Sequence, residues 1–152
     1  ARHTLSATIA KPGDGPPVGG VQPGYGDHMN FNILCLLAMI SSTLFGLAFL
    51  FFPEATTATY GVSGWNPGTT GVARLYGAGL LYLAAAAYAV RDTADSGLRR
   101  RWAMAASAVS VVALVLSLHF VLSGAANAMG WSTVLIYAFF TVGWFVVGRR
   151  AA

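Results

Sequence analysis

Residues 69–83, TTGVARLYGAGLLYL, are apolar enough to lie in lipid and yet include Arg74. They belong to the second of four apolar runs, which cover about residues 31–52, 67–90, 102–122 and 131–147. Each run is close to the ~20 residues that an α-helix needs to cross a ~30 Å hydrocarbon core. No run shows strand-like alternation, and each exceeds the length of a strand. The sequence therefore predicts an all-α integral membrane protein built as a four-helix bundle.

The composition excludes a water-soluble domain. Of the 152 residues, 56% are hydrophobic and 9% are charged, whereas soluble domains have about 25% charged residues. The net charge is +4, but the basic residues flank the apolar runs and form no stripe. We therefore expect membrane lipids and no nucleic acid as partners. The single cysteine, Cys35, leaves no internal disulfide or cysteine zinc site, and we expect it to pack as a small apolar side chain.

The first 28 residues differ in character from the rest. They are rich in Gly and Pro and lack apolar periodicity, so we expect a disordered or extended cytoplasmic tail. Two interpretations of this tail are open. It is a partner-binding arm, with Lys11, Pro12, Pro16 and Pro17 as candidate contacts, or a translated leader before a natural start at Met29. In both cases residues 29–152 form the membrane domain.

Local signals mark the ends of the helices. Pro53 ends the first span and begins a short outer interfacial helix within PEATTATYGV, for which Gly61 is the stop. Asn66 is the expected N-cap of the second span, followed by Pro67. Asp95 or Ser96 is expected to cap the third span.

The basic residues predict the orientation. Basic loops stay in the cytoplasm, so we expect a multi-pass protein of the bacterial inner membrane with both termini cytoplasmic. Trp65 and Trp131 are expected at the outer interface, and Trp102 and Trp144 at the inner one. Arg74 is the single basic residue on the expected outer side. Those on the cytoplasmic side are Arg2, Lys11, Arg91, Arg99, Arg100, Arg101, Arg149 and Arg150.

Small residues predict which helix faces lie inside the bundle. Membrane helices associate where small side chains let their backbones approach closely. On the fourth span, by contrast, bulky aromatic residues including Tyr137, Phe139, Phe140, Trp144 and Phe145 are expected to face lipid or a partner. The small residues expected inside are Ala73 and Gly77 on the second span, and Ser107, Ser110, Ala113 and Ser117 on the third.

Polar side chains from different segments gather in the expected outer leaflet. An Arg74–Glu54 ion pair would fold the interfacial helix back over the bundle. The group is either an outward-facing pocket, for a headgroup, a quinone ring or a small anion, or a structural clasp. The balanced charges and the shallow depth favour the clasp. The candidate residues are Arg74, Glu54, His119, Asn127 and Tyr76, with Tyr60 as a further hydroxyl.

His119 is a candidate ligand of a different kind. It lies nearly opposite Ser110 and Ser117 on its helix and is expected to face lipid or another protein. A lone histidine can ligate haem or a chlorophyll magnesium, but no second histidine lies within the spans. We therefore expect no cofactor, with pigment or haem ligation at His119 as the less favoured alternative. The sequence also has no catalytic set and no metal-ligand spacing, so we expect neither a metal site nor an enzyme.

Three segments carry a resemblance to a known group of proteins: FGLAFLFFPEATTATYGV, ARLYGAGLLYLAAAAYAVRD and GWSTVLIYAFFTVGW. Their order is span, Pro-led outer helix, Ala-Arg-Leu at the start of the second span, and Gly-Trp-Ser at the start of the last. In this order residues 29–152 resemble small four-span bacterial membrane proteins of uncharacterised function, DoxX-like in architecture. The resemblance implies the four-span fold, and its motifs are architectural. The Gly/Pro-rich tail lies outside it.

Two functions fit these features. The leading prediction is a non-enzymatic accessory or assembly subunit of a larger respiratory or photosynthetic membrane complex, because the chain has an unpartnered aromatic face and an unstructured tail. The alternative is a stand-alone binder or carrier of a small molecule, lipid or quinone, which uses the outer pocket of Arg74, Glu54 and His119. A DoxX-like redox enzyme is the least favoured reading, because the sole thiol is expected to be buried.

Overall fold

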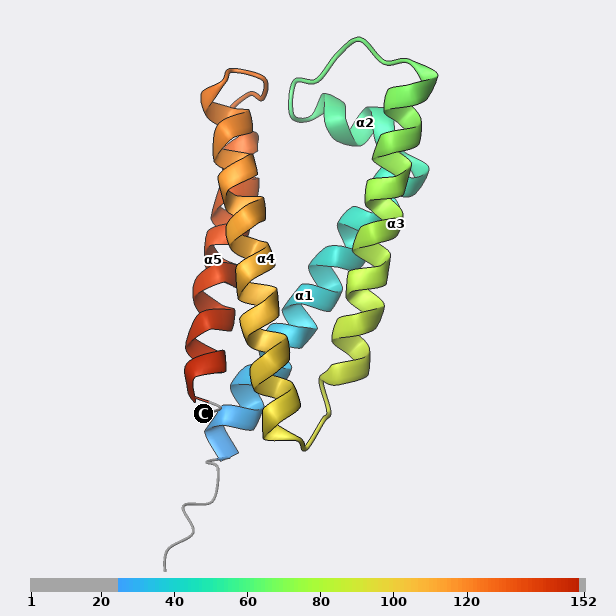
Figure 1. Ribbon diagram of the computed structural model, residues 1–152. Coiled ribbons are helices and arrows are strands. Elements are labelled where there is room, and N and C mark those ends of the chain that lie inside the picture. Colours follow the sequence, from blue (N-terminus) through green and yellow to red (C-terminus); the bar gives the residue numbers. More distant parts are fainter. Residues whose placement is uncertain (1–24, 151–152) are drawn as a thin grey trace, which may run out of the picture.

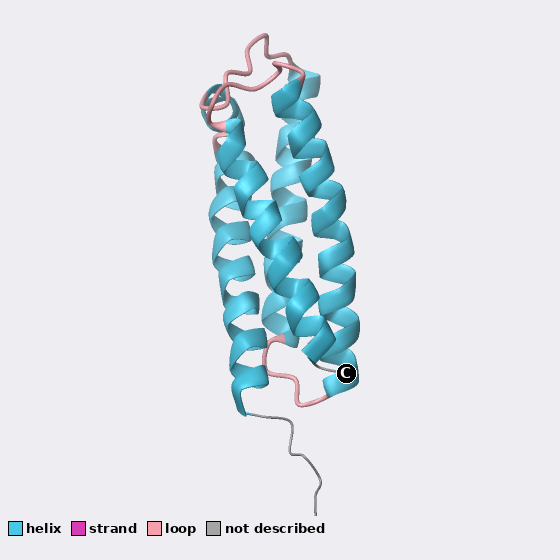
Figure 2. Cartoon of the chain, turned by 90° about the vertical axis from the view of Figure 1, so that its left-hand side faces the viewer, coloured by secondary structure: helices cyan, strands magenta, loops and turns pink. Residues whose placement is uncertain are grey.

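The computed structural model describes the backbone of residues 25–150 and the side chains of residues 30–150 (Figure 1). The candidate tail contacts Lys11, Pro12, Pro16 and Pro17 lie outside this range. Within it, the chain is helical and contains no strand, as predicted (Figure 2). The helices are α1 (Tyr25–Phe51), α2 (Pro53–Ala58), α3 (Pro67–Val90), α4 (Ser96–Leu122) and α5 (Gly130–Arg150).

Four of these helices, α1, α3, α4 and α5, are long and apolar enough to cross a membrane. This confirms the predicted four-span helical fold. The third helix follows the prediction at both ends, and α4 begins at Ser96, as the expected cap at Asp95 or Ser96 requires. In contrast, α1 begins at Tyr25, six residues before the predicted apolar run. Proline is the residue that a helix interior excludes, and the sequence has none between Pro23 and Pro53, so nothing stops α1 from beginning in the predicted tail.

The predicted caps are present. The Asn66 side chain accepts hydrogen bonds from the backbone N–H groups of Gly68 and Thr69, at 2.9 and 3.0 Å, and the Thr69 hydroxyl accepts the Asn66 N–H in return. The Asp95 carboxylate likewise accepts the Leu98 N–H at 3.1 Å at the start of α4. Each cap satisfies donors that have no partner inside the helix.

The short helix α2 is also confirmed. Pro53 is its first residue, and the turn after it ends at Gly61, which has a φ of +83°. Glycine adopts this left-handed conformation without a steric penalty. The Gly61 N–H donates to the Ala58 carbonyl at 3.0 Å and so closes the turn.

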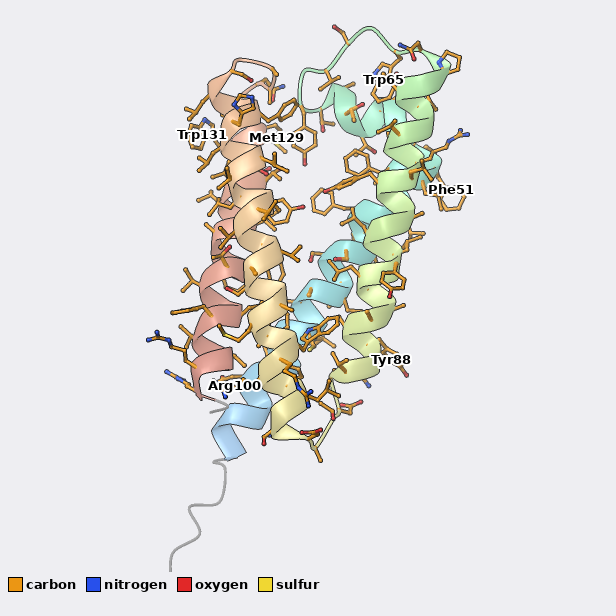
Figure 3. The ribbon with its side chains drawn as sticks, viewed as in Figure 1. Phe51, Trp65, Tyr88, Arg100, Met129 and Trp131 are labelled. Carbon is orange, nitrogen blue, oxygen red and sulfur yellow. The ribbon has the colours of Figure 1, made fainter. Side chains whose placement is uncertain are left out.

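The long helices form two hairpin-like pairs. In the first pair α1 packs along α3, and in the second α4 packs along α5. The helices α3 and α4 are joined by a short loop and yet make little direct contact (Figure 1). We call the end with α2, Trp65, Met129 and Trp131 the α2 end, and the opposite end, with Arg100, the arginine end (Figure 3).

A close backbone contact joins α1 and α3. A Cβ atom on Gly77 would lie 2.8 Å from both the Gly46 carbonyl oxygen and the Leu50 amide nitrogen. Backbone atoms cannot move aside as a flexible side chain can, so this crossing requires glycine. The prediction that Gly77 lies inside the bundle is confirmed, whereas Ala73, one turn earlier, is half-buried.

The pairs meet at the arginine end. The Phe31 ring of α1 packs edge-on against Trp144 of α5, with centroids 6.0 Å apart, and Cys35 beside them is fully buried and free. A Cβ on Gly143 would lie 2.9 Å from Leu34 of α1. The expectation that Trp144 faces lipid or a partner is therefore wrong, because α1 crosses to α5 here and buries the indole ring. Its expected depth at the inner interface stays a prediction.

The small residues of α4 pack on α5 near the same end. Ser107 and Ser110 are buried, as predicted, and the Ser107 hydroxyl donates to the Thr141 carbonyl at 3.1 Å. On α5, Phe139 and Phe145 are exposed, as the prediction of an outward aromatic face requires. Ala113 and Ser117, further along α4, are half-buried.

The crossing of α1 and α3 gives a stability prediction. We expect Gly77→Ala to lower the free energy of unfolding in detergent by about 1–3 kcal/mol, because the added methyl group meets backbone atoms. Gly79→Ala is the matched control on the same helix, since a Cβ there meets nothing within 4 Å. Thermal unfolding of the two variants measures the difference. Equal effects at both positions would contradict the close crossing.

Candidate functional site

The Arg74–Glu54 ion pair expected at the α2 end is not formed. Among the described side chains, the ion pair that does form is between Arg91 and Asp92, near the arginine end, where Nε and Oδ2 lie 2.9 Å apart. Glu54 instead accepts a long hydrogen bond from the Thr70 hydroxyl, at 3.4 Å. Thr70 lies one helical turn, about 6 Å, nearer the helix start than Arg74. The Arg74 side chain is exposed, so the cation does not fasten α2 to α3.

Asn127 provides the connection that the ion pair was expected to make. Its side-chain Nδ2 donates to the Thr59 carbonyl at 3.0 Å, and its backbone N–H donates to the Tyr60 carbonyl at 2.9 Å. Its Oδ1 accepts the Met129 N–H at 2.9 Å and holds the turn before α5. The loop between α4 and α5 is thereby tied to the loop after α2. The clasp predicted at this end exists, but amide and carbonyl groups form it.

His119 lies in the last turn of α4 and is exposed, as its position opposite the serines predicted. In the described part of the chain, no three His, Cys, Asp or Glu side chains are grouped to hold a metal ion. Among the described residues, the hydrogen bond of the Glu54 carboxylate goes to Thr70 and the ion pair joins Arg91 to Asp92, so neither links His119 to Glu54 or Arg74. The outer pocket proposed from the sequence does not assemble from these residues.

A cavity of about 600 Å³ lies instead between the two helix pairs. It exists because each pair is closed within itself, while α3 and α4 stay apart between the contacts at the two ends. On α4 its lining runs from Trp102 to Phe120, which corresponds to about 27 Å along the helix axis. The lining contains only apolar residues and uncharged polar residues, the latter being Ser41, Ser42, Thr57, Tyr60, Tyr76, Trp102, Ser110, Ser117, Thr133, Tyr137 and Trp144.

Two tyrosines form the polar centre of this cavity. The hydroxyl oxygens of Tyr76 on α3 and Tyr137 on α5 lie 3.1 Å apart and share a hydrogen bond. The Phe49 ring packs edge-on against Tyr76, with centroids 5.0 Å apart, and supports its orientation from α1. Among the described residues, the pair is a direct polar contact between α3 and α5, and Tyr76 is the lining residue of α3 that lies nearest the α2 end.

The cavity opens sideways between α3 and α4. Leu83 on α3 and Ala105 and Val109 on α4 line it and are nevertheless exposed. Val109 is 68% exposed, which a residue enclosed by a neighbouring helix would not be. For a protein in a bilayer, an opening between two membrane-spanning helices faces the hydrocarbon of the lipid.

The structure therefore brings together a different set of residues from the one predicted. Of the candidate polar cluster, Tyr76 and Tyr60 line the cavity, and Arg74, Glu54, His119 and Asn127 do not. The packing residues Ser110, Ala113 and Ser117 also line it. Sequence reasoning assigned Tyr137 to the outer surface. Its spacing from Thr133, Phe140 and Trp144, at intervals of three or four residues, is the signal that places these residues on one inward face.

Comparisons of the chain with protein-family models, with characterised proteins and with solved structures found no match. The DoxX-like resemblance therefore stays a prediction.

The amide clasp gives a prediction for the α2 end. Asn127→Ala removes the Nδ2 bond to Thr59 and the Oδ1 bond to Met129, and we expect a loss of about 1–2 kcal/mol of stability. Hydrogen exchange of residues 59–66 should accelerate, because this loop keeps only the backbone bond from residue 127 to the Tyr60 carbonyl and loses the side-chain bond to Thr59. Ser132→Ala is the control, since it removes only a local bond to the Met129 carbonyl. Unchanged exchange in Asn127→Ala would contradict the clasp.

Proposed function

We propose that the protein binds a lipid-soluble small molecule in the cavity between the two helix pairs. The observation that carries this proposal is the cavity itself, about 600 Å³ in volume and almost wholly apolar. Sites for small molecules commonly have about 300–1,000 Å³ and an apolar lining with a few polar groups. Protein interiors otherwise contain few voids larger than a water molecule. A cavity of this size is therefore best explained as a binding site for a ligand.

The contacts at the α2 end favour a small molecule over a protein segment. A spanning helix is about 30 Å long and about 10 Å wide, longer than the roughly 27 Å over which α4 lines the cavity. A partner helix would have to separate the pairs further and break the contacts of Asn127 with Thr59 and Tyr60. A single lipid-soluble molecule needs no such change.

The side opening supplies the route for this molecule. A compound dissolved in the bilayer would enter between Leu83 and Val109 without crossing either polar end of the protein. We propose a binder or carrier without an enzymatic role, in the bacterial inner membrane, with the arginine end in the cytoplasm. The charge asymmetry supports this orientation, since Arg91, Arg99–101, Arg149 and Arg150 belong to one end and Arg74 to the other half.

The prediction of an accessory subunit of a larger complex stays open beside this one. Its support is the outward face of α5, where Leu135, Phe139 and Val142 are exposed. Lipid covers such a face as well as a protein does, so the cavity is the more specific observation.

The proposal predicts that filling the cavity prevents binding. Ala113 lines the cavity, and we expect Ala113→Phe to weaken occupancy about 5- to 150-fold, because overpacking costs about 1–3 kcal/mol. Native mass spectrometry after extraction in mild detergent measures the bound mass. Ala108→Phe is the control, since Ala108 is an exposed residue of the same helix that does not line the cavity. Equal bound mass in both variants, or none in the wild type, would refute the proposal.

The orientation predicts which loops face the cell exterior. Ser63→Cys lies in the loop at the α2 end and Ala94→Cys in the loop at the arginine end, and both positions are exposed. In intact spheroplasts, a membrane-impermeant maleimide should label Ser63→Cys and spare Ala94→Cys until the cells are opened. The native Cys35 is fully buried and contributes little background. Labelling of Ala94→Cys alone would reverse the orientation.

A further inference from the structure

We infer that the Tyr76–Tyr137 pair is the head-group site of the cavity, and that the ligand is an uncharged amphiphile with a hydrocarbon chain and a head that carries a carbonyl oxygen. This inference rests on the proposed function and specifies the chemical class of the ligand. Three observations carry it: the absence of charge around the cavity, the hydrogen-bonding capacity of the tyrosine pair, and the length of the space.

The lining excludes an ionised head group. Among the described residues, no Asp, Glu, Lys, Arg or His lines the cavity. A carboxylate, phosphate or ammonium group taken from water into such a site without a partner loses several kcal/mol or more of solvation. Arg74 and His119 belong to the same half of the protein but do not reach the lining. The site therefore discriminates against phospholipids and free fatty acids.

The tyrosine pair has one hydrogen-bond donor to spare. Two hydroxyl groups that bond to each other use one of their two protons. In the described part of the chain, the second proton has no acceptor, because neither hydroxyl has any other hydrogen bond. A donor in an apolar surrounding without an acceptor is costly. A carbonyl oxygen of the ligand satisfies it, and the bond between the two tyrosines strengthens the donor through cooperativity.

The length of the space fits an extended chain. The lining follows α4 from Trp102 to Phe120, about 27 Å along the helix axis, so a hydrocarbon chain fits lengthwise in the cavity. From the tyrosine pair, the longer part of the lining continues toward the arginine end through Ala87 and Ala106 to Trp102. The chain of the ligand lies along this part.

The test uses the full chain in lipid nanodiscs. The probe is methyl tetradecyl ketone that carries a diazirine in the chain and a terminal alkyne, and labelled residues are mapped by mass spectrometry after irradiation. The competitors are unlabelled methyl tetradecyl ketone, hexadecane, which has the same length without the carbonyl, and hexadecyl sulfate, which is permanently ionised. We expect labelling of cavity residues and competition in the order ketone, hexadecane, hexadecyl sulfate.

The tyrosine variants test the head-group site directly. Either hydroxyl alone can still donate to the ligand, so Tyr76→Phe and Tyr137→Phe should each change the competing concentration of the ketone by less than about 3-fold. The double variant should raise it about 10-fold, since the carbonyl is then buried without a donor, and should leave competition by hexadecane unchanged. Tyr82→Phe is the matched control, because Tyr82 lies on the same helix as Tyr76 but is 78% exposed and does not line the cavity.

The outcomes separate the two proposals. Labelling that Ala113→Phe does not reduce would place the probe outside the cavity and overturn the proposed function. Labelling that Ala113→Phe abolishes, with the double tyrosine variant affecting ketone and hexadecane alike, would retain the cavity and overturn the head-group assignment. Stronger competition by hexadecyl sulfate than by the ketone would also overturn it. The single variants and Tyr82→Phe show that the fold is intact when the double variant is interpreted.

Discussion

The course of α1 is the constraint on which the rest of the structure depends. At the α2 end, α1 contacts α3 through Gly46 and Gly77, where no Cβ could be accommodated. At the arginine end it contacts α5 through Leu34 and Gly143. A straight helix that meets two different neighbours at its two ends must cross the bundle diagonally. The two helix pairs are therefore held together at their ends, and between the ends the Tyr76–Tyr137 hydrogen bond joins α3 to α5 while α3 and α4 stay apart. The cavity is the consequence.

The membrane explains why this separation is stable. In water, an apolar space of about 600 Å³ between helices would tend to close, because burial of apolar surface is favourable. In a bilayer, lipid tails are as apolar as the side chains, so helices associate through local packing and hydrogen bonds. Such contacts are concentrated at three levels of the protein: the aromatic core near Trp144, the tyrosine pair, and the Asn127 clasp. Between these three levels, few contacts hold α3 against α4.

Local features of the fold were predictable from the sequence, and contacts between distant segments mostly were not. The spans, the Asn66 and Asp95 caps and the stop at Gly61 each depend on a few consecutive residues, and all are present. The inward positions of Gly77 and Ser107 follow from small-residue spacing, which is also local. The predicted Arg74–Glu54 ion pair is not formed, because a shared depth in the membrane does not specify whether two long side chains meet. The predicted outward position of Trp144 is wrong, because no local pattern shows that α1 crosses to α5.

The candidate site illustrates the same limit. Tyr76 was named from the sequence as an accessory hydroxyl, but its partner Tyr137 is 61 positions away, and only the tertiary arrangement brings the two together. Asn127 was named for the correct end of the protein, with a different partner. The cavity has no sequence signature of its own, since alanine, serine and aromatic residues that line it also pack helices elsewhere in the chain.

The fastening of both ends has a mechanical consequence. Two helix pairs that are joined at both ends cannot open like a hinge, so any widening of the space between α3 and α4 has to come from bending of these two helices. Loops at the two ends would then keep their spacing while the middle of α3 and α4 bulges outward into the bilayer. A wider ligand would thus displace lipid around the middle of the protein and leave the spacing of the water-exposed loops unchanged.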